Sequence, residues 1–309
     1  MVNFVQKRRI FFTIAGILVA LSLVALAVSA VLYGQALRVS IDFKGGSLFV
    51  LQFKQPVTET AIRDVFVAQG HPAPIVQQLG LSGENLWQVR TRFASADEVG
   101  TIMDALEAQV GPIDRSNSHV DTVEPTVGAE VTRTAGIAVV VASLAVLLFI
   151  WFSFRRVPNA IRYGTVSLVA MAVNVLVTIG FYALMGILQG WEADALFLTA
   201  VLTVIGFSVQ DVIVVFDRIR ENIPRHRGEP YEMIVNRSVM ETVHRSLATQ
   251  LNAMFVMIAI LLFGGATIKP FIAVMLVGML SETFTSLCVA VPLLVVWEER
   301  SRLAKRVAA

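Results

Sequence analysis

Charged side chains are scarce in this sequence of 309 residues, and cysteine is almost absent. Only 16% of the residues are charged and 56% are hydrophobic, whereas an ordinary soluble domain is about one quarter charged. This composition excludes a soluble globular protein. The single cysteine, Cys288, excludes an internal disulfide framework and any zinc site built from several cysteines.

The sequence also has no large excess of charge of one sign, because 25 Lys and Arg residues stand against 23 Asp and Glu residues. A net charge of +2 gives no indication of a nucleic-acid partner, so none is expected. The four histidines do not have the spacing of metal ligands, and we therefore expect no metal site. We expect His71 and His119 to be surface residues.

The sequence is rich in long apolar runs. A bilayer core of about 30 Å needs roughly 20 mostly apolar residues in a helix. Six runs meet this length, and they predict an α-helical polytopic membrane protein with six transmembrane helices. The runs cover residues 10–33, 134–154, 161–188, 195–216, 238–263 and 270–297.

The first apolar run could also be read as a cleavable signal peptide, because it follows basic residues and contains a small-residue Val-Ser-Ala sequence at 28–30. The apolar core of a signal peptide is typically about 7 to 15 residues long. This run exceeds 20 residues, so we interpret it as an uncleaved membrane anchor.

Basic residues cluster in alternate connections between the runs, which fixes the expected orientation. The opposite connections that are short contain only Lys269. Both termini are therefore predicted to be cytoplasmic. The clustered residues are Lys7, Arg8, Arg9, Arg155, Arg156, Arg162, Arg218, Arg220, Arg225, Arg227, Arg300, Arg302, Lys305 and Arg306.

The runs divide the chain into four predicted parts. They are a cytoplasmic N-terminus with helix 1 (1–33), an extracytoplasmic domain (34–133), transmembrane helices 2–6 (134–299) and a basic cytoplasmic tail (300–309). The extracytoplasmic part is about 100 residues long, which is enough for a folded domain rather than a loop.

Hydrophobic patterning predicts a ferredoxin-like α+β domain, in the order βαββαβ, within this extracytoplasmic part. Its second helix opens with the capping box Ser95-Ala-Asp-Glu98 and should bury Val99, Met103, Leu106 and Val110. The first helix should bury Ile62, Val65 and Phe66. The predicted strands and helices cover 47–53, 58–69, 74–79, 86–93, 95–110 and 113–123.

Ionisable residues inside the apolar runs are costly, by at least about 2.5 kcal/mol near a helix centre, so each is a candidate for function. Asp211 lies six residues before Asp217, or about 9 Å inside the charged end of its helix. Arg245 lies at a comparable depth in the next helix, so two antiparallel helices would bring opposite charges to the same depth. We therefore expect Asp211 to be a proton carrier and Arg245 its electrostatic regulator. Glu282 lies deeper, in the middle of the last run.

Each candidate also has a structural interpretation. Asp211 could be a carboxylate hydrogen-bonded to Ser208, one turn away, and Arg245 could extend its charged group to the membrane surface. Glu282 could donate a structural hydrogen bond between helices. These alternatives stay open at the level of sequence.

Two adjacent glycines follow the first run, in the sequence Asp42-Phe-Lys-Gly45-Gly46-Ser47. Such a pair is typical of a sharp turn or of close backbone packing, here where the chain enters its first strand. The segment matches neither of the glycine-rich phosphate-binding patterns.

Five ordered motifs together resemble the SecF side of the SecD/SecF protein-export family, which belongs to the resistance-nodulation-division superfamily. The most specific is GFSVQDVIVVFDRIREN at 206–222, which contains Asp211, Asp217, Arg218 and Arg220 and is similar to the family's GYSxxDTIVVFDRIREN. The other four are IDFKGG at 41–46, VGAE at 127–130, ETVHR at 241–245 and LFGG at 262–265.

The resemblance implies a non-enzymatic half-transporter of six helices that pairs with SecD in a twelve-helix assembly of the bacterial cytoplasmic (inner) membrane, among its lipids. It implies work beside the SecY channel complex on exported, unfolded polypeptides, driven by the proton motive force. Protons would be the coupling ion, with no other cofactor. Asp211 and Arg245 match positions that the family associates with proton movement.

The sequence departs from the family at two positions. Val173-Asn174 stands where members usually have His-Asp, and Asn174 cannot exchange a proton. Glu282 stands where members usually have a small residue. Glu282 could therefore supply a second protonatable site, held partly neutral by burial, or be the structural hydrogen-bond donor already described.

Two other classes of function agree less well with the sequence. A proton-coupled exporter of small molecules or lipids from the same superfamily would usually contain two six-helix halves and two large external domains in one chain. This chain has one of each. A membrane-anchored enzyme would need a nucleophile, a base and an orienting group at recognisable spacing, and the sequence offers no such cluster.

Overall fold

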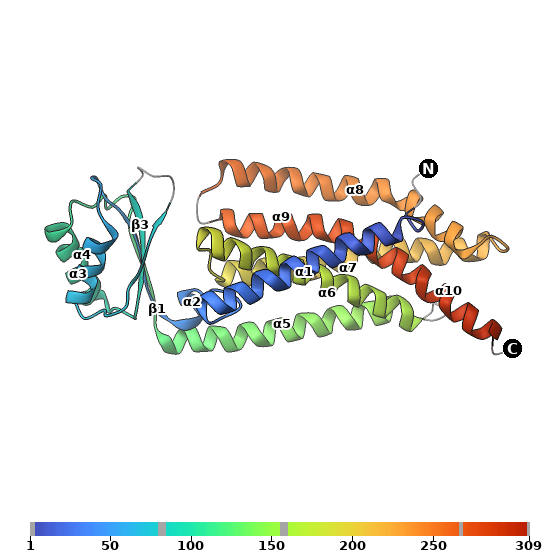
Figure 1. Ribbon diagram of the computed structural model, residues 1–309, viewed down its shortest axis with the longest axis horizontal. Coiled ribbons are helices and arrows are strands. Elements are labelled where there is room, and N and C mark those ends of the chain that lie inside the picture. The colour runs from blue at the N-terminus through green and yellow to red at the C-terminus, as the bar shows by residue number, and fades with distance from the viewer. Residues whose placement is uncertain (1–3, 80–84, 155–159, 266–267, 308–309) are drawn as a thin grey trace. The chain divides into compact units, whose positions relative to one another are not determined.

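The computed structural model describes residues 4–79, 85–154, 160–265 and 268–307 (Figure 1). The predicted basic residues Arg155 and Arg156 lie outside these ranges. The chain divides into two compact units, which are residues 1–38 with 138–309, and residues 39–137. The first unit is helical, and the second contains a small sheet.

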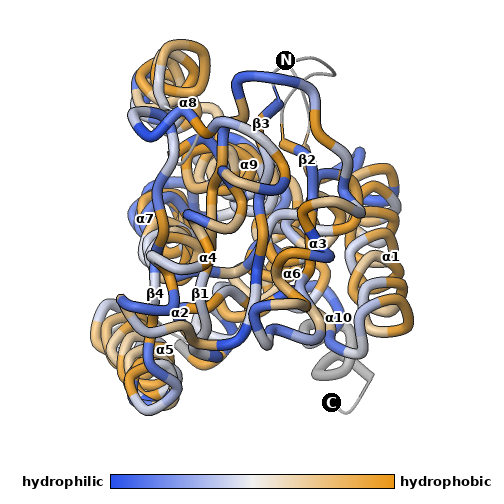
Figure 2. The backbone as a smooth tube through the Cα atoms, turned by 90° about the vertical axis from the view of Figure 1, so that its left-hand side faces the viewer, coloured by the Kyte–Doolittle hydropathy of each residue, from blue (hydrophilic) through white to orange (hydrophobic). Residues whose placement is uncertain are grey.

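Six helices of the described chain are long and apolar enough to cross a membrane, as predicted. Each contains an apolar stretch of at least 18 residues. The first five are α1 (Arg8–Tyr33), α5 (Pro125–Phe154), α6 (Ala160–Gln189), α7 (Ala195–Arg225) and α8 (Tyr231–Phe263). The sixth consists of α9 (Lys269–Phe284), the π-helical turn η1 (Thr285–Ala290) and α10 (Val291–Val307). Hydrophobic residues are prominent on helices such as α5 and α8 in the end-on view of Figure 2.

Several helices extend well beyond the apolar runs that predicted them. The helix expected from residue 134 begins at Pro125, and the helix expected to end at 216 continues to Arg225. The fifth begins at Tyr231 rather than near 238. Hydropathy marks only the length that suits a bilayer, whereas a helix can continue into polar sequence on either side.

Close helix packing in the first unit depends on small residues. α1 packs along α6, and a Cβ atom at Gly180 would lie only 2.5 Å from the Cα atom of Ser22. α7 packs against α6, α8 and α9. The largest apolar cluster joins α6, α7, α8 and α10 and includes Val166, Val212, Phe216, Val235, Val239 and Leu294.

The second unit has the predicted βαββαβ order. Its strands are β1 (Gly46–Gln52), β2 (Ile75–Leu79), β3 (Leu86–Thr91) and β4 (His119–Val123), and its main helices are α3 (Glu59–Ala68) and α4 (Ala96–Gln109). The sheet is antiparallel, in the order β2-β3-β1-β4. This arrangement confirms the ferredoxin-like fold, with α3 and α4 covering one face of the sheet (Figure 1).

Local sequence signals explain the two helices of this domain. Thr58 caps α3, and Ser95 and Glu98 form the predicted capping box of α4. Ile62, Val65 and Phe66 are buried, as expected. In α4 the fully buried side chains are Ile102 and Leu106, while Val99, Met103 and Val110 are only partly buried, so the predicted face was slightly misplaced.

The expectation that His71 lies on the surface is wrong. Its side chain is fully buried, packs edge-on against Phe66 and shares a hydrogen bond of 2.8 Å between its Nδ1 atom and the Thr91 hydroxyl. Burial, and secondarily the positive charge of Arg92, lower the pKa of His71 below its ordinary value of 6.5.

Stability of this domain should therefore decrease as the pH falls. The unfolded chain binds a proton at His71 more readily than the folded domain does. The contribution of neutral His71 to the stability of the domain is therefore present above pH 6.5 and is lost as the pH falls below it. Protease resistance of the domain in intact membranes should fall between pH 7.5 and 5.5. A His119→Gln variant, altered at an exposed histidine, should behave like the wild type, and an equal pH response in His71→Gln would contradict this assignment.

Candidate functional site

Two buried carboxyl groups in the helical unit share one hydrogen-bond donor. Asp211 on α7, Gln250 on α8 and Glu282 on α9 are 5%, 6% and 1% exposed. The Gln250 Nε2 atom donates to Asp211 Oδ2 over 3.1 Å and to Glu282 Oε2 over 2.7 Å. A primary amide has two hydrogens, so it can satisfy both carboxyl groups at once.

Helical spacing places these three side chains inside the unit. On α7 the buried face includes Val204, Ser208, Asp211 and Val215, which recur at intervals of three or four residues. On α8 the buried polar residues Thr242, Ser246 and Gln250 recur at every fourth position.

A glycine allows α9 to approach α7 near Glu282. Gly278 lies one turn before Glu282, and a Cβ atom at Gly278 would collide with the side chain of Val204. The π-helical turn η1 begins three residues after Glu282. Such turns occur frequently at functional sites.

A second polar contact lies on the same face of α7. Asn174 on α6 donates through Nδ2 to the Ser208 hydroxyl over 2.6 Å, and Ser208 donates to the Val204 carbonyl. The predicted alternative, in which Ser208 acts as the partner of Asp211, is not what the structure shows. Asn174 instead links α6 to α7, and Asp211 bonds to Gln250.

Several buried oxygen atoms of this region have no hydrogen-bond partner among the described residues. Buried polar atoms are rarely left unpaired, because each costs free energy. This region can therefore accept additional hydrogen bonds from water or from an acidic proton. The atoms are Asn174 Oδ1, Ser246 Oγ, Gln250 Oε1, Ser281 Oγ and Glu282 Oε1.

The expected pairing of Asp211 with Arg245 is not found. The Arg245 side chain is exposed, whereas Gln250, five residues further along α8, occupies the position beside Asp211. Five residues correspond to a rotation of about 140° around a helix. The depth of Arg245 was estimated from its distance along the helix, but depth does not determine which face carries the side chain.

The charged part of the long motif joins α7 to α8. Arg218 forms ion pairs with Glu221 at 2.7 Å and with Glu241 of α8 at 2.6 Å. The buried Asn222 donates to Ser238 and to Glu241, both on α8. Arg220 and Asp217 form an exposed pair at 3.3 Å along α7. These contacts support a structural role at the end of the helix pair.

The glycine pair in the second unit forms the tight turn that the sequence predicts. Ser40 caps the short helix α2 (Ile41–Lys44), which contains Asp42, and Gly45 and Gly46 follow with φ values of 73° and 127°. A Cβ atom at Gly45 would lie 2.6 Å from the Cα atom of Pro125. The start of α5 therefore packs directly on this turn.

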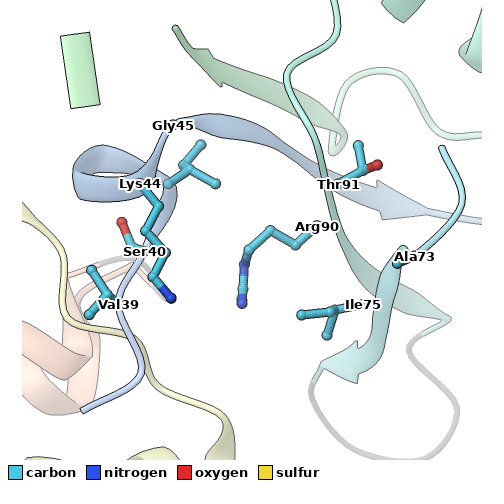
Figure 3. Close-up of a pocket in the computed structure, with 9 residues that line it drawn as sticks. Val39, Ser40, Lys44, Gly45, Ala73, Ile75, Arg90 and Thr91 are labelled. Atoms are coloured by element: carbon cyan, nitrogen blue, oxygen red, sulfur yellow. The ribbon is translucent and has the colours of Figure 1, made fainter. Parts of the chain in front are cut away.

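A hollow lies beside the glycine turn (Figure 3). The side chains of Lys44 from α2 and Arg90 from β3 extend into it. The other residues that line it are Val39, Ser40, Ile41, Gly45, Ala73, Ile75 and Thr91. No acidic side chain is among them. Over the described parts of the chain, no group of three or more His, Cys, Asp or Glu side chains could hold a metal ion.

Comparisons with known proteins all identify the same family. The family described as "Protein export membrane protein SecD/SecF, C-terminal" matches residues 102–300, and the SecD/SecF GG motif matches residues 33–57. The protein translocase subunit SecF of Anaerolinea thermophila is 40% identical over 304 residues, which cover 96% of this chain and 94% of that protein. The subunit from Thermobaculum terrenum is 37% identical over 312 residues, covering 98% and 96%.

A solved structure agrees with these relatives. The crystal structure of SecDF, a translocon-associated membrane protein from Thermus thermophilus, matches with a TM-score of 0.80 and 28% identity. The match covers 96% of this chain but only 39% of the SecDF chain. Since a family match covers more than half of the sequence and close relatives align over nearly its full length, the chain belongs to the SecF family of protein-export membrane proteins.

Proposed function

We propose that this multi-pass membrane protein is an accessory subunit of the Sec protein translocase that works with a SecD partner and uses the proton motive force to promote polypeptide export. The observation that carries the proton part is the buried pair of acids, Asp211 and Glu282, bridged by Gln250. The translocase part is supported by the named SecF relatives and by the SecDF match.

A buried acid suits a proton carrier because burial opposes its charged form while a hydrogen-bond donor favours that form. A change in helix packing that alters either influence would take up or release a proton. Asp211 is the proposed carrier. We do not include Arg245 in the proposed proton path, because its side chain is exposed and lies on a different face of α8 from Gln250.

The proposed partner is SecD. The SecDF chain that this protein matches is more than twice as long as this protein, and its name joins SecD and SecF. The helix α5 offers a surface for it or for membrane lipids, since most of its side chains are exposed, among them the apolar Val140, Leu144 and Phe149. The proposal also includes the SecY channel complex and unfolded exported polypeptides as partners, on the basis of the family's role.

The proposed location is the bacterial cytoplasmic (inner) membrane, with both termini in the cytoplasm and the ferredoxin-like domain outside. The distribution of basic residues supports this orientation. A cysteine introduced at Arg115, in a Cys288→Ser background, should react with a membrane-impermeant maleimide added outside intact cells. Reaction only after the reagent is given access to the cytoplasmic side would show that the orientation is the opposite of the one proposed.

Depletion of this chain tests its assignment to export. Cells that lose it should accumulate unprocessed precursors of secreted proteins, and resupply of the chain should clear them. The sharpest form of the test compares export in energised membranes with export after the proton gradient is collapsed, with and without the chain. Normal precursor processing accompanied by loss of efflux of a small molecule or lipid would instead favour the exporter alternative.

A further inference from the structure

Asp211 and Glu282 are close enough to influence each other's charge directly. One oxygen of each carboxyl group lies within 3.1 Å of the same Gln250 nitrogen. Two carboxylates that share a buried site cannot both be charged without strong mutual repulsion. Their protons therefore belong to the pair rather than to either residue alone.

Among the side chains that the structure describes on the surrounding helices, none supplies a buried positive charge to offset the two carboxylates. The buried polar side chains described on α6, α7, α8, α9 and η1 are Ser, Thr, Asn and Gln besides the two acids. The other charged residues near these helices lie in ion pairs closer to the helix ends, as for Arg8 with Glu299, Arg162 with Glu298 and Arg218 with Glu241, or are exposed, as for Arg9, His244 and Arg245.

We propose that Asp211, Gln250 and Glu282 form a single proton-binding site, in which the two carboxyl groups hold one proton between them and Gln250 positions them for this. The site then carries a charge of −1, and release of its proton to water leaves two carboxylates and a charge of −2. This inference rests on the proposed proton-driven function but specifies its chemistry. Gln250 has no titratable group, so it acts as a positioning residue.

The contribution of Gln250 follows from its contacts. Its amide hydrogens stabilise the ionised forms of both carboxyl groups and hold them on either side of one nitrogen atom. Without the amide, charge on the pair is less well compensated, so the proton should be held more tightly. A hydrogen bond to a charged group is strong enough to change proton affinity by roughly tenfold or more.

Infrared titration of the purified full-length chain in complex with its partner, in lipid vesicles, measures this proton directly. Protonated carboxyl groups give a C=O absorption that disappears on ionisation. In the wild type, one buried carboxyl should remain protonated at neutral pH. Asp211→Asn and Glu282→Gln should each lower the pH at which the remaining group ionises, by roughly one unit or more, because its charged neighbour is gone.

The two variants separate a shared proton from two independent acids. If one substitution removes the neutral-pH absorption and the other leaves its titration unchanged, the groups are independent and the proposal is overturned. Gln250→Leu should move the titration to higher pH by roughly tenfold in proton affinity. The matched control is Asn252→Leu, which removes an exposed amide from the same helix and should titrate like the wild type.

Export measured on the same preparations distinguishes the two proposals. If the absorption behaves as expected but the rate of wild-type export does not depend on the proton gradient, the shared site is supported and the proposed function is contradicted. If export requires the gradient but the acids titrate independently, the proposed function stands and the shared site fails. Should Asp211→Asn not assemble, Glu282→Gln and Gln250→Leu still decide the result, because unaltered titration in both contradicts the proposal.

Discussion

Replacing Asp211 by Asn should reduce polypeptide export in energised membranes to the rate observed when the proton gradient is collapsed. Asn has nearly the same size as Asp and can still accept the hydrogen bond from Gln250, so the helix packing should survive. It cannot bind and release a proton. The measurement is the rate of precursor translocation with and without a gradient, in membranes that contain equal amounts of wild-type or variant protein.

The matched control for this loss is Glu221→Gln on the same helix. Glu221 is partly exposed and pairs with Arg218, and a glutamine can still accept that hydrogen bond. The control should retain its response to the gradient. Wild-type export by Asp211→Asn under a full gradient would remove Asp211 from the proton path.

Replacing Gly45 by Ala should strongly destabilise the ferredoxin-like domain. The backbone of Gly45 has φ 73° and ψ 169°, a conformation essentially restricted to glycine, and imposing it on another residue costs roughly 1–3 kcal/mol. The added methyl group would also overlap the backbone of Pro125. We expect rapid proteolysis of the ferredoxin-like domain when the protease has access to it, with little full-length protein remaining.

Gly100 provides the control for the glycine substitution. It lies within α4 of the same domain, and a Cβ atom there would meet no other atom within 4 Å. Gly100→Ala should leave the domain as protease-resistant as the wild type or slightly more so, since alanine favours a helix by about 1 kcal/mol. Equal resistance of the Gly45→Ala and Gly100→Ala variants would show that the glycine turn is not required for stability.

Much of the fold could be predicted because its signals are local. The length of an apolar run reports a membrane span, and the Ser95 and Glu98 capping box marks the start of a helix. The glycine pair likewise predicted the turn before β1, since only glycine adopts that backbone geometry easily. These features depend on residues close together in the chain.

The site was predicted only in part, because its geometry depends on which helix faces meet. Asp211 and Glu282 were identified from the cost of placing an acid in an apolar run. Gln250 was missed because an amide is not ionisable, although its fourth-residue spacing from Thr242 and Ser246 was a visible signal. Arg245 was chosen from its distance along the helix, but its side chain lies on another face of α8 than Gln250.

His71 illustrates a different limit of sequence reasoning. A histidine in a polar-looking loop gives no local indication of burial, and its burial arises from contacts with Phe66 and with Thr91. The burial of His71 depends on its contact with Thr91 on a separate strand, which the local sequence does not reveal. The π-helical turn after Glu282 was likewise not predicted, because no residue pattern in the sequence indicates it.

Proton movement during export tests the central claim most directly. Vesicles containing the translocase, this chain and its SecD partner would be loaded with a pH-sensitive dye, and a single round of export would be started by adding a precursor. The account predicts proton movement down the gradient that begins with export in the wild type and is absent in Asp211→Asn. Equal precursor-dependent proton movement in the two proteins would contradict it.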